Sequence, residues 1–479
     1  MISDIYALHN PNKYARLTKR AKLSFPEIDA RIKQKLISLE IGDINLWTNP
    51  SYNKNEFVHS IFAYPAMMVP EVQRQIIDVI FANSGSQHVT SLLDPFMGSS
   101  TSLISGMHYG IDCYGQDINP LAILISKVRT TLVNVNFKVL RKKNKALLDQ
   151  INTDNSDAVE VSFKGIDKWF KPVVQIELSK IVRAIRLEED IRIRRFYWAN
   201  LAEVIRNCSN DRTSTYKLHM RPVEQIEARS TSALTELKKQ LSQSLESYWV
   251  FKSFLRKKGR LSAKGYRGKI NIQYGNSVDS IRFDGQGGFA DLLVSSPPYG
   301  DNHTTVPYGQ YSFLQLQWVD LVDIDSGIST DCLNSTAKID SDSVGGRRSD
   351  SALLEKAAQI CTQSASFKQD YIKFSQLSKD RFNKIVVFLY DLDKVIENSL
   401  AALKDNSYLV WTMGDRSVGN GLVRNVQYLK ELLENKGCVF VHSITRTILN
   451  KRMAQKNNNT NLMNTEEIII FRKASIKGA

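Results

Sequence analysis

Two consecutive segments of the chain share one pattern, in which an apolar strand ends at an acidic residue and is followed by a turn and a helix. The first is VTSLLDPFMGSSTSLISG, from residue 89, and the second is IDCYGQDINPLAILISKV, from residue 111. Strands that alternate with helices predict a parallel sheet with helical crossovers. We therefore expect an α/β fold built on a doubly wound, mostly parallel sheet.

The rest of the chain divides by composition into further segments. Charged helical stretches dominate after the second strand pattern, and strand patterns resume near residue 270 with INIQYGNSV and FADLLVSSPPYG. The stretch from about residue 322 to 368 has few large apolar residues, which is typical of a loop or of partial disorder. The predicted segments are an N-terminal extension (1–55), a first α/β half (56–130), a helical insertion (131–268), a catalytic half (269–321), a polar insertion or loop (322–368) and a final α/β part (369–479).

The charge balance favours an anionic partner. The 479 residues contain 64 Lys and Arg against 49 Asp and Glu, which gives a net charge of +15. An excess of this sign is typical of proteins that bind nucleic acid, although a basic protein without such a partner is also possible. The five scattered cysteines form no metal-binding or disulfide pattern, and no apolar run is long enough to span a bilayer. We expect a cytoplasmic protein without a metal site.

The two acidic turns suggest a nucleoside cofactor. Asp94 ends the first strand, and Gly98 lies in the turn that opens the next helix, where backbone can approach a ligand closely. Asp117 ends the second strand about 20 residues later, where a carboxylate can accept hydrogen bonds from ribose hydroxyls. Helix capping by Asp117 and simple packing of the turn are the alternatives. The dinucleotide-binding and P-loop glycine motifs are absent, which disfavours NAD, FAD, ATP and GTP.

The stretch DLLVSSPPYGD, residues 291–301, ends a buried strand in two prolines and a tyrosine. Pro297 and Pro298 hold a rigid extended loop and lack N–H donors, so nearby carbonyl oxygens stay free as acceptors. With the Ser296 hydroxyl, such acceptors suit an exocyclic amino group, and Tyr299 offers a stacking face. A packing turn is the alternative for the tetrapeptide alone.

Taken together, DPFMGSST and SSPPYGD resemble the paired signatures of bacterial site-specific amino-group DNA methyltransferases, which use S-adenosylmethionine. VHSIFAYPAMMVP, YGQDINPLA and YGNSVDS are similar to other segments of these enzymes, as are GDNHTTVPYGQYSFLQLQWV and RTILNKRMAQKNN…MNTEEIIIF. The resemblance covers roughly residues 55–130, 270–320 and 375–473. It implies a seven-stranded sheet of the S-adenosylmethionine-dependent methyltransferase type with a helical insertion.

The resemblance also implies roles for individual residues. The target-base pocket would comprise Ser296, Pro297, Pro298 and Tyr299, with Tyr299 stacked on a base flipped out of double-stranded DNA. The cofactor would contact Tyr64, Pro65, Asp94, Pro95, Phe96, Gly98, Ser99, Thr101, Asp117, Asn119 and Asn276. Two positions depart from the family pattern. Ser100 replaces a second glycine of the turn, and Asn276 replaces the usual aspartate near the adenine.

The loop of residues 296–299 is called the base loop. Its first residue, Ser296, favours cytosine N4 over adenine N6, because serine is commoner there in the cytosine enzymes of the family. Methylation at cytosine carbon 5 is disfavoured, since it needs a thiolate nucleophile and no cysteine follows a proline. An RNA or protein-glutamine methyltransferase and a non-catalytic DNA-binding subunit are the alternatives. The family also implies a restriction-modification or phage-defence setting with a separate endonuclease.

DNA contacts are expected from basic residues of the two insertions, which can reach phosphates and groove edges. The helical insertion ends in RKKGRLSAKGYRGK, and the polar insertion contains a pair of arginines. The predicted DNA-binding residues are Lys257, Lys258, Arg260, Lys264, Arg267, Arg347 and Arg348.

Overall fold

The computed structural model describes residues 23–49, 57–84, 89–285, 287–300, 302, 305–347, 352–418, 421–448 and 465–475. Its centre is a seven-stranded sheet with strand order β10-β11-β7-β6-β1-β2-β5. Only β11 runs antiparallel to its two neighbours, β7 and β10. The strands are β1 (Ser91–Asp94), β2 (Asp112–Asp117), β5 (Ile270–Tyr274), β6 (Ala290–Ser295), β7 (Leu403–Met413), β10 (Cys438–Thr447) and β11 (Thr465–Lys473).

This topology confirms the predicted doubly wound, mostly parallel sheet of seven strands. β1 pairs in parallel with β2 on one side and with β6 on the other, so the strand order reverses beside β1. A crevice at such a switch point is where open α/β sheets bind ligands, outside the carboxyl ends of the strands. The sheet thus has a carboxyl edge, where the parallel strands end, and an opposite amino edge, where they begin.

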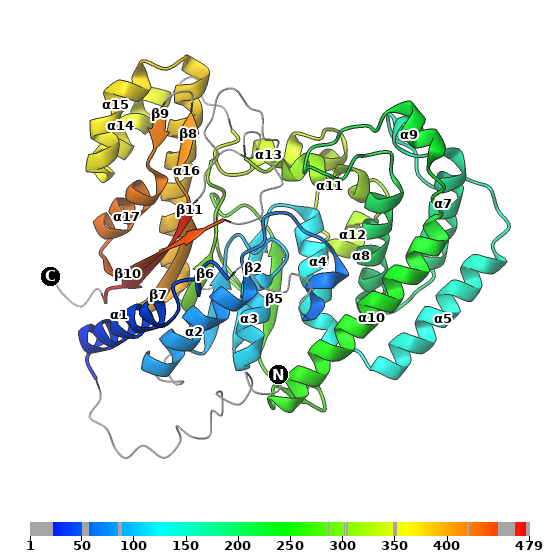
Figure 1. Cartoon of the computed structure of the whole chain (residues 1–479), viewed down its shortest axis with the longest axis horizontal. Coiled ribbons are helices and arrows are strands. Elements are labelled where there is room, and N and C mark those ends of the chain that lie inside the picture. The colour runs from blue at the N-terminus through cyan, green and yellow to red at the C-terminus, as the bar shows by residue number, and fades with distance from the viewer. Residues whose placement is uncertain are drawn as a thin grey trace.

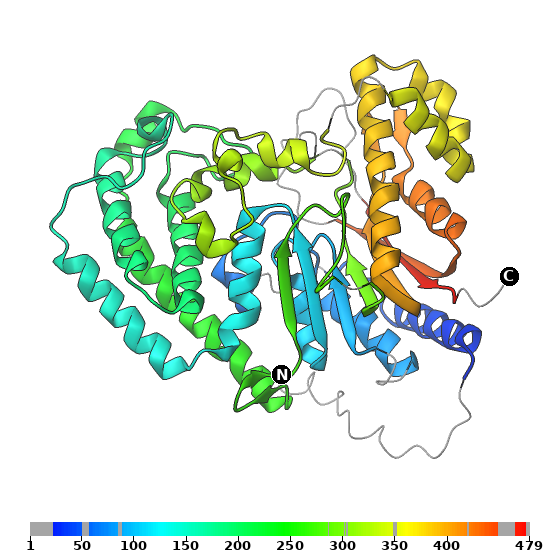
Figure 2. The ribbon, with the colours of Figure 1, turned by 180° about the vertical axis from the view of Figure 1, so that it is seen from behind.

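Helices cover both faces of the sheet (Figures 1 and 2). One face is covered by α1 (Phe25–Gly42), α2 (Pro70–Ser84), α3 (Thr101–Tyr109) and α4 (Pro120–Thr131). The other is covered by α16 (Lys379–Ala402) and α17 (Asn425–Asn435), onto which α14 (Leu353–Gln363) and α15 (Ala365–Ser375) pack. Leu92 and Leu93 lie next to each other in β1 but belong to the cores on opposite faces. Burial on both faces explains why β1 and β6 are apolar runs without alternation.

The helical insertion forms a lobe beyond the β5 edge of the sheet (Figure 1). It packs directly on the sheet domain, since α8 contacts α4, and α10 contacts the short helix η3 (Phe57–Ile61). Polar contacts reinforce this junction, where the Gln240 side-chain amide donates to the Ile61 carbonyl. The elements of this helical lobe are η4 (Leu132–Asn134), α5 (Phe137–Thr153), α6 (Ile166–Trp169), α7 (Pro172–Arg186), α8 (Ile191–Cys208), α9 (Val223–Ala228) and α10 (Ala233–Lys257).

The predicted polar loop is more ordered than its composition indicates. The range 322–368 contains short helices, and its few apolar side chains, such as Ile339 and Val344, are buried. In α14 the buried residues Leu353, Ala357 and Ile360 follow helical spacing. In the described part of this range, a sparse apolar pattern is therefore enough to pack the helices against the domain. The remaining elements are α11 (Tyr308–Leu316), α12 (Leu321–Ile324), η5 (Thr330–Leu333), α13 (Lys338–Asp342) and two hairpins, β3–β4 (Leu261–Ser262, Gly265–Tyr266) and β8–β9 (Arg416–Val418, Gly421–Val423).

The N-terminal helix α1, predicted as part of an extension, is integrated with the sheet. Asp29 accepts hydrogen bonds from the Tyr408 hydroxyl at 2.8 Å and from Arg472 Nε at 2.9 Å. The buried residues of α1, Ile28, Ile32 and Leu36, belong to the core on the sheet face that α2 also covers. Residues 25–42 therefore belong structurally to the sheet domain.

Candidate active site

The carboxyl edge brings the predicted cofactor and base residues together. Asp94 ends β1, Asp117 ends β2, and Ser296 directly follows β6. Because β1 lies between β2 and β6, the three side chains come from neighbouring strands that end at the same edge. Asn276 follows β5 by two residues and lies at the same edge. The site is thus assembled by parallel pairing of segments that are about 200 residues apart in sequence.

The cofactor turn between β1 and α3 depends on close backbone approaches. Gly98 adopts a φ of +48°, and a Cβ added there would lie 3.3 Å from the Tyr64 ring. Its N–H donates to Asp117 Oδ2 at 2.8 Å, which fixes the turn against β2. Ser100 adopts a left-handed φ of +68°, a conformation that favours glycine. Ser100 thus holds a backbone conformation that a glycine would adopt with less strain.

Asp94 is fully buried and joins the cofactor turn to the catalytic strand. Its carboxylate accepts hydrogen bonds from the Phe96 N–H at 3.0 Å and from the Ser295 hydroxyl at 2.6 Å. The Ser102 hydroxyl of α3 also donates to it. Burial raises the pKa of the Asp94 carboxyl to about 6, although these three hydrogen bonds favour the charged form. Asp94 ties β1, α3 and the residue before Ser296 together, and its cofactor contact stays a prediction.

Asp117 is half-buried and its carboxylate bridges two backbone N–H groups, those of Gly98 and Asn119. Burial raises the pKa of Asp117 to about 6, and the nearby Asp94 charge adds to the rise. A carboxylate has more acceptor positions than these two bonds use. Asp117 can therefore still accept from the hydroxyls of a ribose.

An aromatic wall beside the turn is formed by Tyr64, Tyr308 and Tyr311, and Asn119 is hydrogen-bonded to Tyr64. The Asn119 amide caps α4 by accepting from the Leu121 N–H and donates to the Tyr64 hydroxyl at 3.0 Å. The Tyr64 ring stacks on Tyr308, with ring centres 5.9 Å apart, and meets Tyr311 edge-on. Pro65, beside Tyr64, is buried. The segment before the cofactor turn and the start of α11 thus meet over Gly98.

The Asn276 side chain is engaged within its own turn. Its Oδ1 accepts from the Val278 N–H at 3.1 Å, and its Nδ2 donates to the Asp342 carbonyl at 2.9 Å. Ser277 donates to the Pro95 carbonyl at 2.6 Å, which links the two turns. The adenine contact of Asn276 stays a prediction, and the carboxyl end of α13 limits the space around it.

The base loop is held by one contact within itself and by contacts from two other elements, β11 and α17. The Ser296 and Tyr299 hydroxyls are 3.3 Å apart, and the Tyr299 hydroxyl donates to Glu466 at 2.8 Å. The Asn425 amide at the start of α17 donates to the Tyr299 carbonyl at 2.9 Å. Burial raises the pKa of the Tyr299 hydroxyl well above its usual value. The half-buried Pro298 and Tyr299 follow the buried Pro297, so the loop presents one face outward.

The cofactor site fits a ligand with ribose hydroxyls and cationic groups. Two carboxylates end β1 and β2, and the half-buried Gly98 lies in the turn after β1. Within the described ranges, the buried Ser99 hydroxyl has no protein partner, which leaves it available to a ligand. Thr101 is buried at the first turn of α3, and Phe96 is half-buried in the turn. These donors and acceptors match the nucleoside and amino-acid ends of S-adenosylmethionine.

Three residues of the site were not predicted from the sequence. Arg129 of α4 is fully buried and donates to the carbonyls of Ser99, His59 and Phe62, so it clamps the cofactor turn to the segment before α2. Asn425 and Glu466 hold Tyr299. Alternation along β11 indicates that Glu466 and Glu467 point to opposite faces, but the sequence does not say which one faces the pocket.

The basic segment of residues 257–267 lies at the amino edge of the sheet, away from the pocket. It immediately precedes β5, whose first residue pairs with Cys113 near the start of β2. Arg260 Nε donates to the His108 carbonyl at the end of α3, and the Lys269 N–H donates to Asp112. The predicted DNA-binding residues of this segment are therefore not brought together with the predicted base-pocket residues. They are Lys257, Lys258, Arg260, Lys264 and Arg267.

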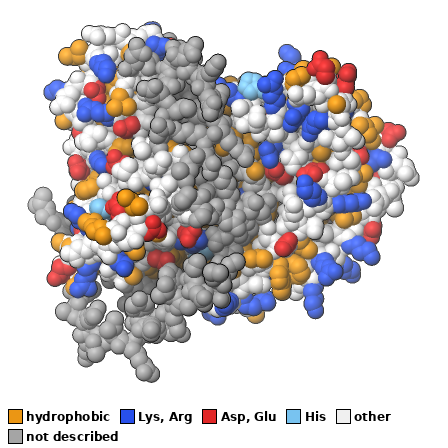
Figure 3. All heavy atoms as spheres, viewed as in Figure 1, with side chains coloured by type: hydrophobic (Ala, Val, Ile, Leu, Met, Phe, Trp, Pro, Cys, Tyr) orange, Lys and Arg blue, Asp and Glu red, His pale blue; other side chains and the backbone are white. Residues whose placement is uncertain are grey.

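Other basic side chains do lie at the carboxyl edge. Arg347 is exposed, with its guanidinium 3.5 Å from Asp279 in the turn after β5. Arg348 lies outside the described residues. Figure 3 shows Lys and Arg side chains spread over the visible face of the helical lobe, so they form no single patch on that face.

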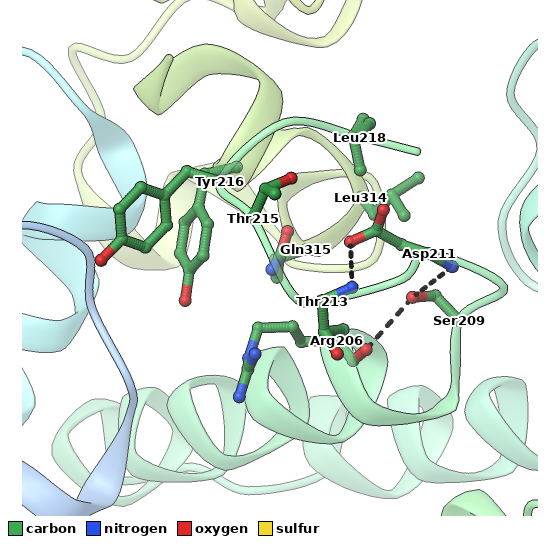
Figure 4. Close-up of a pocket in the computed structure, with 10 residues that line it drawn as sticks. Arg206, Ser209, Asp211, Thr213, Thr215, Tyr216, Leu218, Leu314 and Gln315 are labelled. Carbon is green, nitrogen blue, oxygen red and sulfur yellow. Dashed lines mark hydrogen bonds between the residues drawn. The ribbon is translucent and has the colours of Figure 1, made fainter. Parts of the chain in front are cut away.

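A hairpin loop of residues 210–221 in the helical lobe reaches the aromatic wall. The Arg212 N–H donates to the His219 carbonyl, and Asp211 accepts from the His219 N–H at 2.7 Å, which closes the loop. The loop packs on α11 around a small pocket lined by Tyr216, Leu314 and Gln315 (Figure 4). Tyr216 meets Tyr311 edge-on at 6.0 Å. Arg212 and Lys217 of this hairpin loop are exposed, and Tyr216, beside Lys217, is the residue that contacts the aromatic wall.

Comparison with known proteins supports a methyltransferase. The chain is 29% identical over 454 residues to the type II methyltransferase M.MvaI of Kocuria varians, covering 91% of this chain and 96% of that protein. It is 28% identical over 145 residues to the type II methyltransferase M.MjaII of Methanocaldococcus jannaschii, covering 29% of this chain and 26% of that protein. No family model matches the chain.

Among solved structures, the rRNA methyltransferase aviRa of Streptomyces viridochromogenes aligns over 86% of this chain and 89% of its own. Its TM-score is 0.30 at 9% identity, and a likeness this low carries no argument. In the described ranges no helix is both long and apolar enough to cross a membrane. The same ranges contain no cluster of three or more His, Cys, Asp or Glu side chains suited to a metal ion.

Proposed function

We propose that this protein is a DNA methyltransferase that transfers a methyl group from S-adenosylmethionine to the exocyclic amino group of a flipped base, cytosine N4 in the first place. The observation that carries the proposal is the junction of the cofactor turn and the Ser296–Tyr299 loop at one sheet edge, tied together by Asp94 and Ser295. Similarity to proteins named type II methyltransferases over most of the chain supports it. A role in restriction-modification, beside a separate endonuclease, is part of the proposal.

The residues would divide the work of binding and positioning. Asp117 would accept the ribose hydroxyls, and the turn from Asp94 to Thr101 would surround the methionine end. When bound, S-adenosylmethionine supplies an electrophilic methyl group on a sulfonium centre. Ser296 and the free carbonyls of the loop would accept the amino hydrogens of the base, while Tyr299 would stack on its ring. Direct transfer between two held groups needs positioning more than covalent catalysis.

DNA would approach the carboxyl edge, because the base pocket opens there. The hairpin loop of residues 210–221 presents Arg212 and Lys217 on this side, next to the aromatic wall. We propose that these side chains and Arg347 contact phosphates near the flipped base. The segment 257–267 would contact DNA only if the duplex extended around to the amino edge, so we assign it a lesser role.

The product of the reaction tests the proposal. The purified protein is incubated with double-stranded DNA and radiolabelled S-adenosylmethionine, and the DNA is digested to nucleosides. Label in N4-methyl-2′-deoxycytidine would support the full proposal, and label in N6-methyl-2′-deoxyadenosine would keep the reaction but overturn the choice of base. Absence of label in DNA, together with label in RNA or in no acceptor, would contradict a DNA methyltransferase.

A further inference from the structure

Glu466 contacts the base loop although its strand, β11, is separated from β6 by β7. It lies in β11, and its Oε2 accepts from the Tyr299 hydroxyl at 2.8 Å. Its Oε1 accepts from Arg446 of β10 at 2.8 Å, and the two ion-paired side chains are only 11% and 10% exposed. The pairing of Arg446 with Glu466 in the sheet register keeps both side chains on one face. Glu466 is thus held in place from both sides.

The contact with Glu466 decides the direction of the hydrogen bonds in the base loop. A carboxylate that is ion-paired with an arginine only accepts hydrogen bonds, so the single hydroxyl hydrogen of Tyr299 points to Glu466. Toward Ser296 the Tyr299 oxygen can then only accept, so the Ser296 hydroxyl donates across the 3.3 Å contact. The lone pairs of Ser296 Oγ are left as acceptors. Without Glu466 the serine hydroxyl could point its hydrogen at the base instead.

We propose that Glu466 is a positioning residue that orients the chain Ser296–Tyr299–Glu466 so that Ser296 accepts a hydrogen of the base amino group. The inference rests on the proposed function, because it concerns how the same pocket holds its amino group. It also explains how a loop that begins with serine, rather than aspartate, obtains the influence of a carboxylate. The carboxylate acts from a distance through two hydroxyls. The Ser296–Tyr299 contact is long for two hydroxyls, and such contacts tighten when substrate binds.

The same chain provides a path for the proton that the reaction releases. The nitrogen lone pair forms the new bond to carbon, and the electron pair of the carbon–sulfur bond goes to sulfur, so the amino nitrogen becomes positively charged. That nitrogen then loses one proton to Ser296 Oγ, while the Ser296 proton passes to Tyr299 and the Tyr299 proton passes to Glu466. Glu466 ends neutral and the methylated base ends uncharged, which balances charge and protons.

The test compares Glu466→Gln with Glu467→Gln in steady-state DNA methylation. Glu467 is a matched control, since it is the next residue of β11 and pairs with Lys430 at 2.8 Å, outside the base loop. For Glu466→Gln we expect kcat to fall roughly 10- to 100-fold, with the KM for DNA and the cofactor Kd within about twofold of wild type. Glu467→Gln is expected to leave kcat within about twofold.

Tyr299→Phe separates this role from a structural one. The ring is kept but the chain is cut, so kcat should fall as in Glu466→Gln, and the double variant should show no further loss. Losses that multiply in the double variant, or a normal kcat in Glu466→Gln, would overturn the inference.

Two outcomes keep the test interpretable. If Glu466→Gln does not fold, as judged by thermal melting, Glu466→Asp should show the same kcat loss, because its shorter side chain cannot span the 2.8 Å contact. A normal kcat in Glu466→Asp would then overturn the inference. Failure of the proposed function has a different signature, since the wild-type protein itself would place no methyl group on DNA.

Discussion

The two edges of the central sheet carry different kinds of residues: the predicted cofactor and base-loop residues lie at the carboxyl edge, and a dense basic segment lies at the amino edge. At the carboxyl edge, Asp94, Asp117 and Ser296 follow three neighbouring strands, and the hairpin loop of the helical lobe joins them through its contact with α11. At the amino edge lies the segment 257–267, with the higher density of Lys and Arg in the sequence. Arg260 there packs on the end of α3, where it donates to the His108 carbonyl.

The difference leads us to expect the DNA surface at the carboxyl edge rather than where Lys and Arg are densest in the sequence. Carboxyl ends of parallel strands converge by topology, and a ligand pocket forms where the strand order reverses. A basic run acquires no such position from its composition. Arg212 and Lys217 of the hairpin loop are therefore expected to contribute more to DNA binding than the cations of the segment 257–267 at the amino edge.

Substitutions in the base loop should lower kcat more than any others. If they did not, the carboxyl edge would not be the site of methyl transfer. Ser296→Ala and Tyr299→Ala should each lower kcat by about 100-fold or more, because they remove the acceptor and the stacking face of the amino group. The cofactor Kd, measured by calorimetry, should stay within about twofold, since neither side chain lies in the cofactor turn. Full activity in either variant would show that the loop does not form the base pocket.

A matched pair of charge removals sharpens the comparison between the edges. The double variant Arg212→Ala/Lys217→Ala should raise the KM for DNA about tenfold at roughly 0.1 M salt and reduce the slope of log K against log salt by about 2. Lys257→Ala/Lys264→Ala removes the same charge from exposed positions at the amino edge and should change both quantities much less. The reverse ranking would put the DNA surface at the amino edge.

A smaller effect is expected when pH is lowered. The pKa of Asp117 is raised to about 6 by burial, so the carboxyl becomes protonated as pH falls through 6. Ribose hydroxyls and a cationic ligand favour the ionised form, so cofactor affinity should be full above pH 6 and lost below it. At pH 5.5 the Kd should rise about fourfold relative to pH 7.5.

The variant Asp117→Asn provides the control for this titration. Its cofactor Kd should be weaker at pH 7.5 but should change less between pH 7.5 and 5.5, apart from any contribution of Asp94, whose pKa is also raised to about 6. A Kd for the wild type that stays constant over this range would remove Asp117 from the cofactor site.

Much of the sheet could be predicted from local pattern. The strands ending at Asp94 and Asp117, and the strand before Ser296, are apolar runs bounded by turns, which single sequences reveal well. Helix α2 begins at Pro70, and a proline in the first turn is typical of a helix start. The gathering of Asp94, Asp117 and Ser296 followed from the rule that parallel strands end at one edge.

Other features depend on distant contacts that no local pattern encodes. The sequence around Arg129 indicates an exposed arginine on a helix. The side chain is instead fully buried against carbonyls of the cofactor turn and of the segment before α2. Glu466 and Glu467 are equivalent in sequence, and only the register of β11 directs Glu466 to Tyr299. The segment 257–267 had the composition of a DNA surface, but its connection to β5 fixed it at the amino edge.

The structure of the protein with S-adenosylhomocysteine bound would test the central claim most directly, namely that one site at the carboxyl edge holds cofactor and base together. We predict that the ribose hydroxyls contact Asp117, that the amino-acid portion lies along the turn from Asp94 to Thr101, and that the sulfur faces the loop of Ser296 and Tyr299. A ligand bound elsewhere, or one whose sulfur points away from Ser296, would contradict the account.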